Sequence, residues 1–584
     1  MISSGICVIK SQYIAEISNN SSETNSNEPE SASNHQVNHN PPSKKQKLEL
    51  KKKKNKGQNK SRPVTFRQNR ETQLCHSLID VREDEVPPKC PKLSCNFIHD
   101  TEVYLKIKPP DIGDECYNFK NFGHCPRGLT CRFGKNHITE NGKNKIDKEH
   151  RPINHVLNNL SIDTQQLLRK KQYNFKLAEN VVKYYDSKKK EQQEKVNTNN
   201  KNENLITTGD VLKTQGTVTD EDVVKLLNRE KKKINWRNKL YLSPLTTVGN
   251  LPFRRICKEF GADITCGEMA MCSSLLQGSP NEWALVKRHP AEDLFGVQLC
   301  TNNPYLIAKC ALLLEQNISV DFVDLNLGCP IDLVYKEGAG CGLLRRPKVL
   351  EACVRSASTI LNVPFTVKTR MGVYNNDNVA HKMVKKFEEW GASAVTIHGR
   401  SREQRYTKLA DWSYIQTCVK AAYSFPIIGN GDILSYEDYK LAIETCPEMA
   451  TVMIGRGALI KPWIFTEIKE QKLWDISSSE RFNIIKKYVN YGLEHWGSDT
   501  KGVENTRRFL LEWLSFLHRY VPVGLLETPP QKMNQRPPKY VGRNDLETLM
   551  ASSSSMDWIK ISEMLLGPVP EGFQFLPKHK ANAY

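Results

Sequence analysis

Residues 394–430 read AVTIHGRSREQRYTKLADWSYIQTCVKAAYSFPIIGN, and the fold prediction starts from this stretch. A short β-branched run at its start and another at its end enclose a segment of helical length. Two strands joined by a helical crossover run parallel in one sheet. The stretch therefore predicts one unit of a parallel α/β fold.

The same unit recurs on both sides of this stretch, from about residue 240 to residue 455. The eight apolar runs are LYLS (240–243), ADIT (262–265), LFGVQL (294–299), FVDLN (322–326), FTVK (365–368), AVTIH (394–398), PIIGN (426–430) and TVMIG (451–455). Segments of helical length separate them. Eight such units within about 230 residues predict a (β/α)8 TIM barrel rather than a doubly wound sheet.

Composition divides the rest of the chain. Residues 19–40 are rich in Asn, Ser and Glu, whereas FNIIKKYVNYGLEHW and TRRFLLEWLSFLHRYV carry apolar residues at helical spacing. We predict a disordered basic tail over 1–70, two zinc fingers over 71–140, a linker over 141–235, the barrel over 236–474 and a helical domain over 475–584. Deleting residues 1–70 is expected to change localisation or affinity without removing activity.

The net charge fits a polyanionic partner such as nucleic acid, and good solubility alone is the alternative. The chain carries +19, with 42 Lys+Arg against 29 Asp+Glu in residues 1–235 and 42 against 36 in residues 236–584. Nine lysines between Lys44 and Lys60 are typical of nuclear import or RNA contact, and a merely solvated tail is the alternative. We expect a protein of the cytoplasm, the nucleus or both. No apolar run is long enough for a membrane span, and no obligate protein partner is evident.

Six of the 17 cysteines fall within residues 75–131 and form two Cys3His sets with nearby histidines. The sets are Cys75, Cys90, Cys95 and His99, and Cys116, Cys125, Cys131 and His137. Three thiolates and one imidazole suit a structural zinc ion, so we predict two zinc sites. The aromatic and basic residues between the ligands are Phe97, Tyr117, Phe119, Phe122, Arg127, Arg132 and Phe133. They predict RNA contact, and purely structural fingers are the alternative.

Polar residues end the predicted strands, where the active sites of such barrels lie. They are Pro244, Glu268, Gln298, Asn326, Lys368, His398, Asn430 and Arg456. Each one alone could be a helix N-cap, but the set predicts a functional pocket. Gly429 and Gly431 follow the seventh strand, and Gly455 and Gly457 follow the eighth. Loops in these two places are the usual phosphate site of the fold, so a phosphorylated cofactor or substrate is predicted.

A cysteine directly follows the fourth strand, in LNLGCP (325–330). Cys329 lies where a nucleophile or a proton donor would act. Cys341 is the competing candidate, and an inert role for either cysteine remains open.

These motifs together are similar to one enzyme family. SPLTTVGNLPFRR (243–255), LNLGCP, VKTRMG (367–372), TIHGRSREQRY (396–406), IIGNGDI (427–433) and IGRGAL (454–459) resemble the tRNA-dihydrouridine synthases. The two Cys3His sets and the C-terminal segment resemble the branch that carries N-terminal CCCH fingers and modifies tRNA position 47. The resemblance covers nearly all of residues 75–584.

The resemblance implies a flavoenzyme that uses FMN and NADPH to reduce a uridine in tRNA to 5,6-dihydrouridine, with Cys329 as proton donor. It implies that the C-terminal helical domain binds tRNA. The implied cofactor-binding residues are Pro244, Leu245, Thr246, Gln298, Lys368, His398, Asn430, Gly431, Asp432, Gly455 and Arg456. We further expect Arg400, Arg402 and Arg405 to meet RNA phosphates at the pocket rim. Messenger RNA stays open as a second substrate. An RNA-binding scaffold without chemistry and a flavin oxidoreductase acting on a free pyrimidine are the alternatives.

Overall fold

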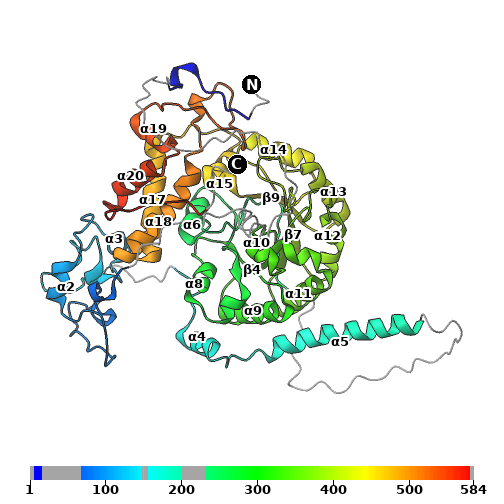
Figure 1. Ribbon diagram of the computed structural model, residues 1–584, viewed down its shortest axis with the longest axis horizontal. Helices are drawn as coiled ribbons and strands as arrows, with labels where there is room; N and C mark the ends of the chain where they lie inside the picture. The colour runs from blue at the N-terminus through cyan, green and yellow to red at the C-terminus, as the bar shows by residue number, and fades with distance from the viewer. Residues whose placement is uncertain (1–4, 16–67, 148, 150–155, 200–230, 579–584) are drawn as a thin grey trace, which may run out of the picture.

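The computed structural model describes residues 5–15, 68–147, 149, 156–199 and 231–578. Eight parallel strands close into a barrel with helices around it, as predicted (Figure 1). They are β1 (Tyr241–Leu242), β2 (Ile264–Cys266), β4 (Leu294–Cys300), β5 (Phe322–Leu327), β6 (Phe365–Arg370), β7 (Ala394–His398), β8 (Ile427–Asn430) and β9 (Thr451–Ile454). The ring closes because β1 pairs with β2 and β9, and β2 also pairs with β4. A two-residue strand that the sequence does not predict, β3 (Ala270–Met271), pairs in parallel with the carboxyl end of β4.

The outer layer follows the helical segments between the strands. Its helices are α6 (Leu251–Glu259), α7 (Cys272–Leu276), α8 (Pro280–Trp283), α9 (Pro304–Asn317), α10 (Asp332–Lys336), α11 (Pro347–Ile360), α12 (Ala380–Glu389), α13 (Trp412–Ala422), α14 (Tyr436–Thr445), α15 (Arg456–Ile460) and α16 (Ile464–Glu470). Asn250, Asn303, Asp411 and Ser435 cap four of them by accepting hydrogen bonds from first-turn N–H groups. The caps therefore come from loop residues beyond the strand ends.

An aromatic cluster fills the barrel below the strand ends. Trp236 and Tyr241 meet Phe322 edge-on, with ring centroids 5.4 and 5.9 Å apart. All three side chains are buried together with Ile264 and Met453. The amino-terminal half of the barrel is therefore a packed core, and only the carboxyl end is left for a site.

The C-terminal helices pack against one side of the barrel (Figure 1). They are α17 (Ser478–Trp496), α18 (Thr500–Leu517), α19 (Asp545–Ala551) and α20 (Ser555–Leu566). Trp513 of α18 donates its indole N–H to the Leu459 carbonyl at 3.0 Å and meets Phe253 of α6 at 5.5 Å. This packing turns one end of α18 toward the carboxyl end of the barrel. Within the described ranges, no helix combines the length and apolar character of a membrane crossing.

The predicted linker over 141–235 differs from the structure, which has helices α4 (Ile162–Arg169) and α5 (Lys176–Asn199) there. Ala178 and Val182 lie one helical turn apart on α5 and are buried against Ala308 and Leu312 of α9. Because most residues of α5 are polar, this short apolar face could not be recognised in the sequence. Residues 200–230 lie outside the described residues.

The predicted disorder of residues 1–70 also differs from the structure at residues 5–15. This segment lies against residues 521–541 of the helical domain, because Cys7 and Ile9 bury their side chains there. The lysine run between Lys44 and Lys60 lies outside the described residues.

Candidate active site and Cys/His clusters

Seven of the eight strand-end residues line one cavity of about 330 Å³ at the carboxyl end of the barrel. The predicted catalytic and cofactor-binding residues that line it are Pro244, Leu245, Thr246, Gln298, Cys329, Lys368, His398, Asn430, Gly431, Asp432, Gly455 and Arg456. Glu268 is the exception, because its carboxylate turns away to accept the Thr247 N–H at 2.5 Å. The strand-end residues do not serve as helix N-caps, since Asn250, Asn303, Asp411 and Ser435 cap four of the helices.

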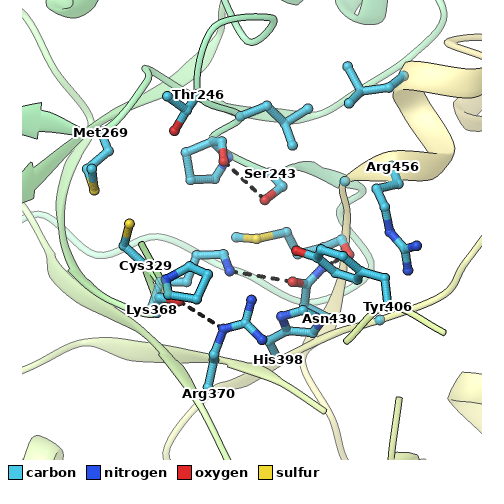
Figure 2. A pocket seen from close by; sticks show the side chains of 18 of the residues that line it. Ser243, Thr246, Met269, Cys329, Lys368, Arg370, His398, Tyr406, Asn430 and Arg456 are labelled. Carbon is cyan, nitrogen blue, oxygen red and sulfur yellow. Dashed lines mark hydrogen bonds between the residues drawn. The ribbon is translucent and has the colours of Figure 1, made fainter. Parts of the chain in front are cut away.

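The cavity has two chemically different ends. Figure 2 shows Cys329 beside Met269 at one end and Arg456 with Tyr406 at the other. Lys368 lies between the two ends. A thiol at one end and a guanidinium at the other suit an elongated ligand with an anionic tail.

A chain of amides and one carboxylate fixes the side chains at the floor. Asn326 donates to Gln298 Oε1 at 2.8 Å, and Gln298 donates to Asp324 Oδ2 at 2.8 Å. Thr366 donates to the other Asp324 oxygen at 2.6 Å. Burial raises the pKa of Asp324 to about 6, although these donors and Lys368 oppose the increase. The chain holds the Gln298 amide in one orientation toward the cavity.

Lys368 places a cation on β6 at the centre of the cavity. Its ammonium lies 3.4 Å from Asn430 Oδ1, and Asn430 donates its own amide to the Met453 carbonyl at 2.7 Å. Burial and the neighbouring Arg370 lower the pKa of Lys368. A half-buried ammonium with a single weak acceptor in the described residues is suited to an anionic group of a ligand.

His398 ends β7 and is neutral in this surrounding. Burial, followed by the charges of Arg370 and Lys368, holds its pKa well below the ordinary value of 6.5. Its Nε2 lies 3.2 Å from Arg400 Nη1, so the neutral ring nitrogen accepts a hydrogen bond. The His398 ring is also stacked on Tyr406, with centroids 6.1 Å apart.

Arg400 departs from its predicted place at the rim. Its side chain is fully buried and donates to Asp432 Oδ2 at 2.5 Å and to the Lys408 carbonyl at 2.6 Å. Arg402 is half-buried, with its guanidinium 3.7 Å from the Tyr335 ring centre, and Arg405 is exposed. The Arg400 guanidinium is therefore occupied by hydrogen bonds inside the protein. The turn after β7 folds this side chain back toward the barrel.

The loops after β8 and β9 meet at the Asp432 carboxylate. Arg456 donates to Asp432 Oδ1 at 2.5 Å, opposite the Arg400 contact. A Cβ added to Gly455 would lie 3.6 Å from the Ser243 Cβ, on the cavity side of the loop. The absence of a side chain leaves room for a ligand to approach the backbone closely there.

Cys329 lies in the turn after β5 and is 8% exposed. Asn326 Oδ1 accepts its backbone N–H at 2.8 Å, which fixes the turn. Burial raises the pKa of the thiol, against opposing effects of a backbone hydrogen bond and of Arg370 and Arg402. Cys341 is fully buried and does not line the cavity, so the geometry favours Cys329 for contact with a ligand.

Sequence reasoning missed several lining residues. They are Ser243, Met269, Arg370, Tyr406, Phe516 and Met533, among others. Arg370 donates to the Gly328 carbonyl at 2.8 Å, beside the catalytic candidate, and both Arg370 and Tyr406 occur in the motifs quoted above. Phe516 and Met533 come from the helical domain, so strand ends could not reveal them.

The structure brings the ligand atoms of each Cys3His set within 4.8 Å of one another. Cys75 Sγ lies 3.6 Å from Cys90 Sγ, and Cys131 Sγ lies 3.8 Å from Cys116 Sγ. His137 Nδ1 is paired with Asn144 Oδ1 at 3.0 Å, while its buried Nε2 has no hydrogen-bond partner among the described residues. A free Nε2 beside three thiols is the arrangement that a metal ion would complete.

The second set is docked on the helical domain at the corner between α17 and α18 (Figure 1). Ser498 Oγ lies 3.1 Å from Cys131 Sγ and 3.4 Å from Cys125 Sγ, and its carbonyl accepts the Arg132 N–H at 2.8 Å. Arg127 donates to the Trp496 carbonyl at 3.3 Å. These contacts join the second Cys3His set directly to the helical domain.

The aromatic residues of this finger are used largely inside the protein. Phe119 stacks on His137 with centroids 5.4 Å apart, and Tyr117 meets Tyr491 of α17 at 6.4 Å. Phe133 packs against the main core. These side chains are only partly buried, however, and their stacking on RNA stays a prediction.

Comparison with known proteins gives one consistent result. The model of the dihydrouridine synthase (Dus) family matches residues 241–517. A Xenopus tropicalis protein named tRNA-dihydrouridine(47) synthase [NAD(P)(+)]-like is 54% identical over 541 residues, covering 91% of this chain and 84% of that protein. A Homo sapiens protein of the same name is 53% identical and covers 90% and 84%, and one of Arabidopsis thaliana is 44% identical and covers 90% and 87%.

Proposed function

The chain belongs to the dihydrouridine synthase family, and on that premise we propose that it reduces a uridine of tRNA to 5,6-dihydrouridine. The observation that carries the proposal is the single cavity that holds Cys329, Lys368 and both phosphate-type loops. The names of the relatives support position 47 as the target and NAD(P)H as the reductant.

FMN is the cofactor that we propose for the cavity. The fit rests on the open approach at Gly455, on Arg456 at the same end, and on the buried amides and the half-buried ammonium between the two ends. Arg456 and the loops after β8 and β9 would hold the phosphate, while Gln298, Lys368 and Asn430 would bind the polar edge of the ring system. When reduced by NAD(P)H, FMN supplies the hydride that uracil accepts at C6.

Cys329 is the proton donor in this proposal. Its raised pKa keeps the thiol protonated at neutral pH, and its Sγ would deliver that proton to C5 of the uracil. Lys368 stabilises negative charge in the cavity, and neutral His398 accepts from Arg400 while facing the ligand. Limited solvent access at Cys329 keeps water from competing for the reaction.

Zinc is the metal that we propose for both Cys3His sets. Sulfur and imidazole donors in this ratio suit structural zinc, and the free His137 Nε2 supplies the fourth donor of the second site. Asn144 holds the other nitrogen of the His137 ring and thereby selects the tautomer that can bind.

Transfer RNA is the proposed substrate because a free pyrimidine requires neither the fingers nor a helical domain. The net charge of +19 supports a large polyanionic partner such as tRNA. We also propose that the protein acts in the cytoplasm, the nucleus or both, on the basis of the lysine run. Import of a reporter fused to residues 40–62 would support the nuclear share, and its exclusion would count against it.

The test is position-resolved mass spectrometry of an unmodified tRNA after incubation with the purified protein and NADPH. We expect one reduced uridine at position 47 and none in a matched tRNA with cytidine there. Bound, reducible FMN without any product would overturn tRNA as the substrate. If the protein neither binds FMN nor forms product, an RNA-binding scaffold without chemistry is favoured. A messenger-RNA fragment in the same assay tests whether messenger RNA is a second substrate.

A further inference from the structure

Residues 5–15, here called the strap, bridge two distant parts of the 521–541 loop (Figure 1). At one end, the Cys7 N–H donates to the Arg536 carbonyl at 2.9 Å and Arg536 N–H donates to the Gly5 carbonyl at 2.9 Å. In the middle, the Lys10 N–H donates to the Leu525 carbonyl at 3.0 Å. The strap therefore ties the start of the loop to its second half.

The side chains of the strap alternate between the protein and solvent. Cys7 and Ile9 are 2% and 3% exposed and pack against Val521, Leu525 and Leu526. Ile6 is 47% exposed. This alternation is that of a strand with one buried face, so the strap occupies a shaped site rather than resting on the surface.

The 521–541 loop reaches the active-site cavity through Met533, which lines it. Residues 526–544, all of them described, form no helix or strand. Arg536, the main partner of the strap, lies three residues after Met533. The loop thus depends on contacts with other segments, and the strap supplies backbone partners on both sides of Met533.

We propose that the strap is a positioning element of the active site, which holds the 521–541 loop so that Met533 forms the cavity wall. Loss of the strap exposes Leu525 and Leu526 and leaves the loop amides without partners. The wall then loosens, and the RNA substrate is held less well. This inference reverses the expectation that residues 1–70 can be deleted without loss of activity, and its activity readout rests on the proposed function.

The experiment compares the full chain with deletions of residues 1–15 and 16–67 and with Ile9→Asp and Ile6→Asp. Hydrogen–deuterium exchange at residues 521–541 and kcat/KM on tRNA are measured for each. We expect faster exchange and about a tenfold lower kcat/KM for the 1–15 deletion and for Ile9→Asp. The 16–67 deletion should leave the exchange of residues 521–541 as in the full chain, and the matched Ile6→Asp variant should leave both the exchange and kcat/KM unchanged. Should Ile9→Asp fail to fold, Ile9→Ala serves as the milder variant.

Adding back a peptide of residues 1–15 tests whether the strap itself, and not a general loss of stability, causes these effects. Added to the 1–15 deletion, the peptide should saturably restore slow exchange and kcat/KM, and the same peptide with Ile9→Asp should not. Unchanged exchange after deletion, or a peptide that gives no protection, would overturn the strap. A full chain that makes no dihydrouridine would count against the proposed function, whereas the exchange and peptide measurements would still decide this inference.

Discussion

At the residue scale, two neighbouring cysteines differ in their access to the cavity. Cys329 and Cys341 are twelve positions apart, and the N–H of Cys341 donates to the Cys329 carbonyl at 3.3 Å. Only Cys329 lines the cavity, beside Arg370 and Met269. The pair therefore offers a test in which burial and residue type are nearly matched.

Cys329→Ala should lower dihydrouridine formation about 100-fold or more, because the proton for C5 loses its donor. Binding of FMN and tRNA should be retained, and Cys341→Ala should stay close to the unaltered protein. Product yield from tRNA by mass spectrometry, with flavin content from absorbance, measures both. A wild-type yield from Cys329→Ala would remove the thiol from the mechanism.

The pH dependence follows from the direction of the same pKa shift. Burial raises the pKa of Cys329 above its ordinary value of 9.0, against Arg370 and Arg402, while Cys300 and Cys341 are the other titratable groups nearby. Because the protonated thiol is the active form in the proposed mechanism, turnover should be level through neutral pH. It should decline only above pH 9, as the proton is lost. A decline centred below pH 8 in single-turnover rates would contradict this assignment.

Site residues could be predicted from the sequence where a polar residue stands at the end of a predicted strand. The strand ends placed Gln298, Lys368 and His398 in one cavity because a parallel barrel brings those ends together. Arg400 was misplaced because its direction depends on a turn and on the Asp432 carboxylate, neither of which a motif specifies.

At the element scale, the second finger is docked on the helical domain rather than standing apart as a separate module. The α17–α18 corner supplies Ser498 to the thiol groups, and Asp499 caps α18 by accepting the Gly502 N–H at 3.1 Å. Hydrogen bonds to metal-bound thiolates stabilise the charged ligands. The corner therefore links metal binding to the fold of the helical domain.

Ser498→Ala should speed the release of zinc to a chelator and lower the free energy of unfolding by about 1 kcal/mol, since a buried hydrogen bond to sulfur is lost. Ser479→Ala, on the exposed first turn of α17, is the control. Chromogenic zinc release and thermal unfolding measure the two effects. Equal release rates for both variants would show that the corner does not support the metal site.

Whether an element could be predicted from the sequence depends on how far apart in the chain its contacting residues lie. The barrel strands are predictable because their apolar runs recur within each local unit. The strap and α5 are not, because their apolar faces are short and become meaningful only against Leu525 or Ala308, far away in the chain.

At the scale of the whole molecule, the helical domain contacts the barrel, the second finger and the strap. It packs on the barrel, contributes Phe516 and Met533 to the cavity, receives the second finger at Ser498 and binds the strap. The full sequence carries a net charge of +19. Affinity for RNA is therefore expected to depend on ionic strength more than flavin binding does.

Raising salt from ~100 to ~300 mM should weaken tRNA binding by about tenfold or more, because condensed counterions compete with lysine and arginine. Flavin content should change little over the same range, since its proposed site lies within the barrel cavity. Filter binding for tRNA and absorbance for flavin give the two curves. A tRNA affinity independent of salt would argue against phosphate contacts as the main source of binding.

The docking of the strap and of the second finger on the helical domain has a consequence for biosynthesis. Both segments leave the ribosome before Ser498 and Leu525 have been translated. At roughly 5–20 residues per second, they wait on the order of tens of seconds for their partners. The nascent chain thus exposes Cys7, Ile9 and the cysteines of the finger until translation nears its end, and this interval is when chaperones and zinc delivery would have to act.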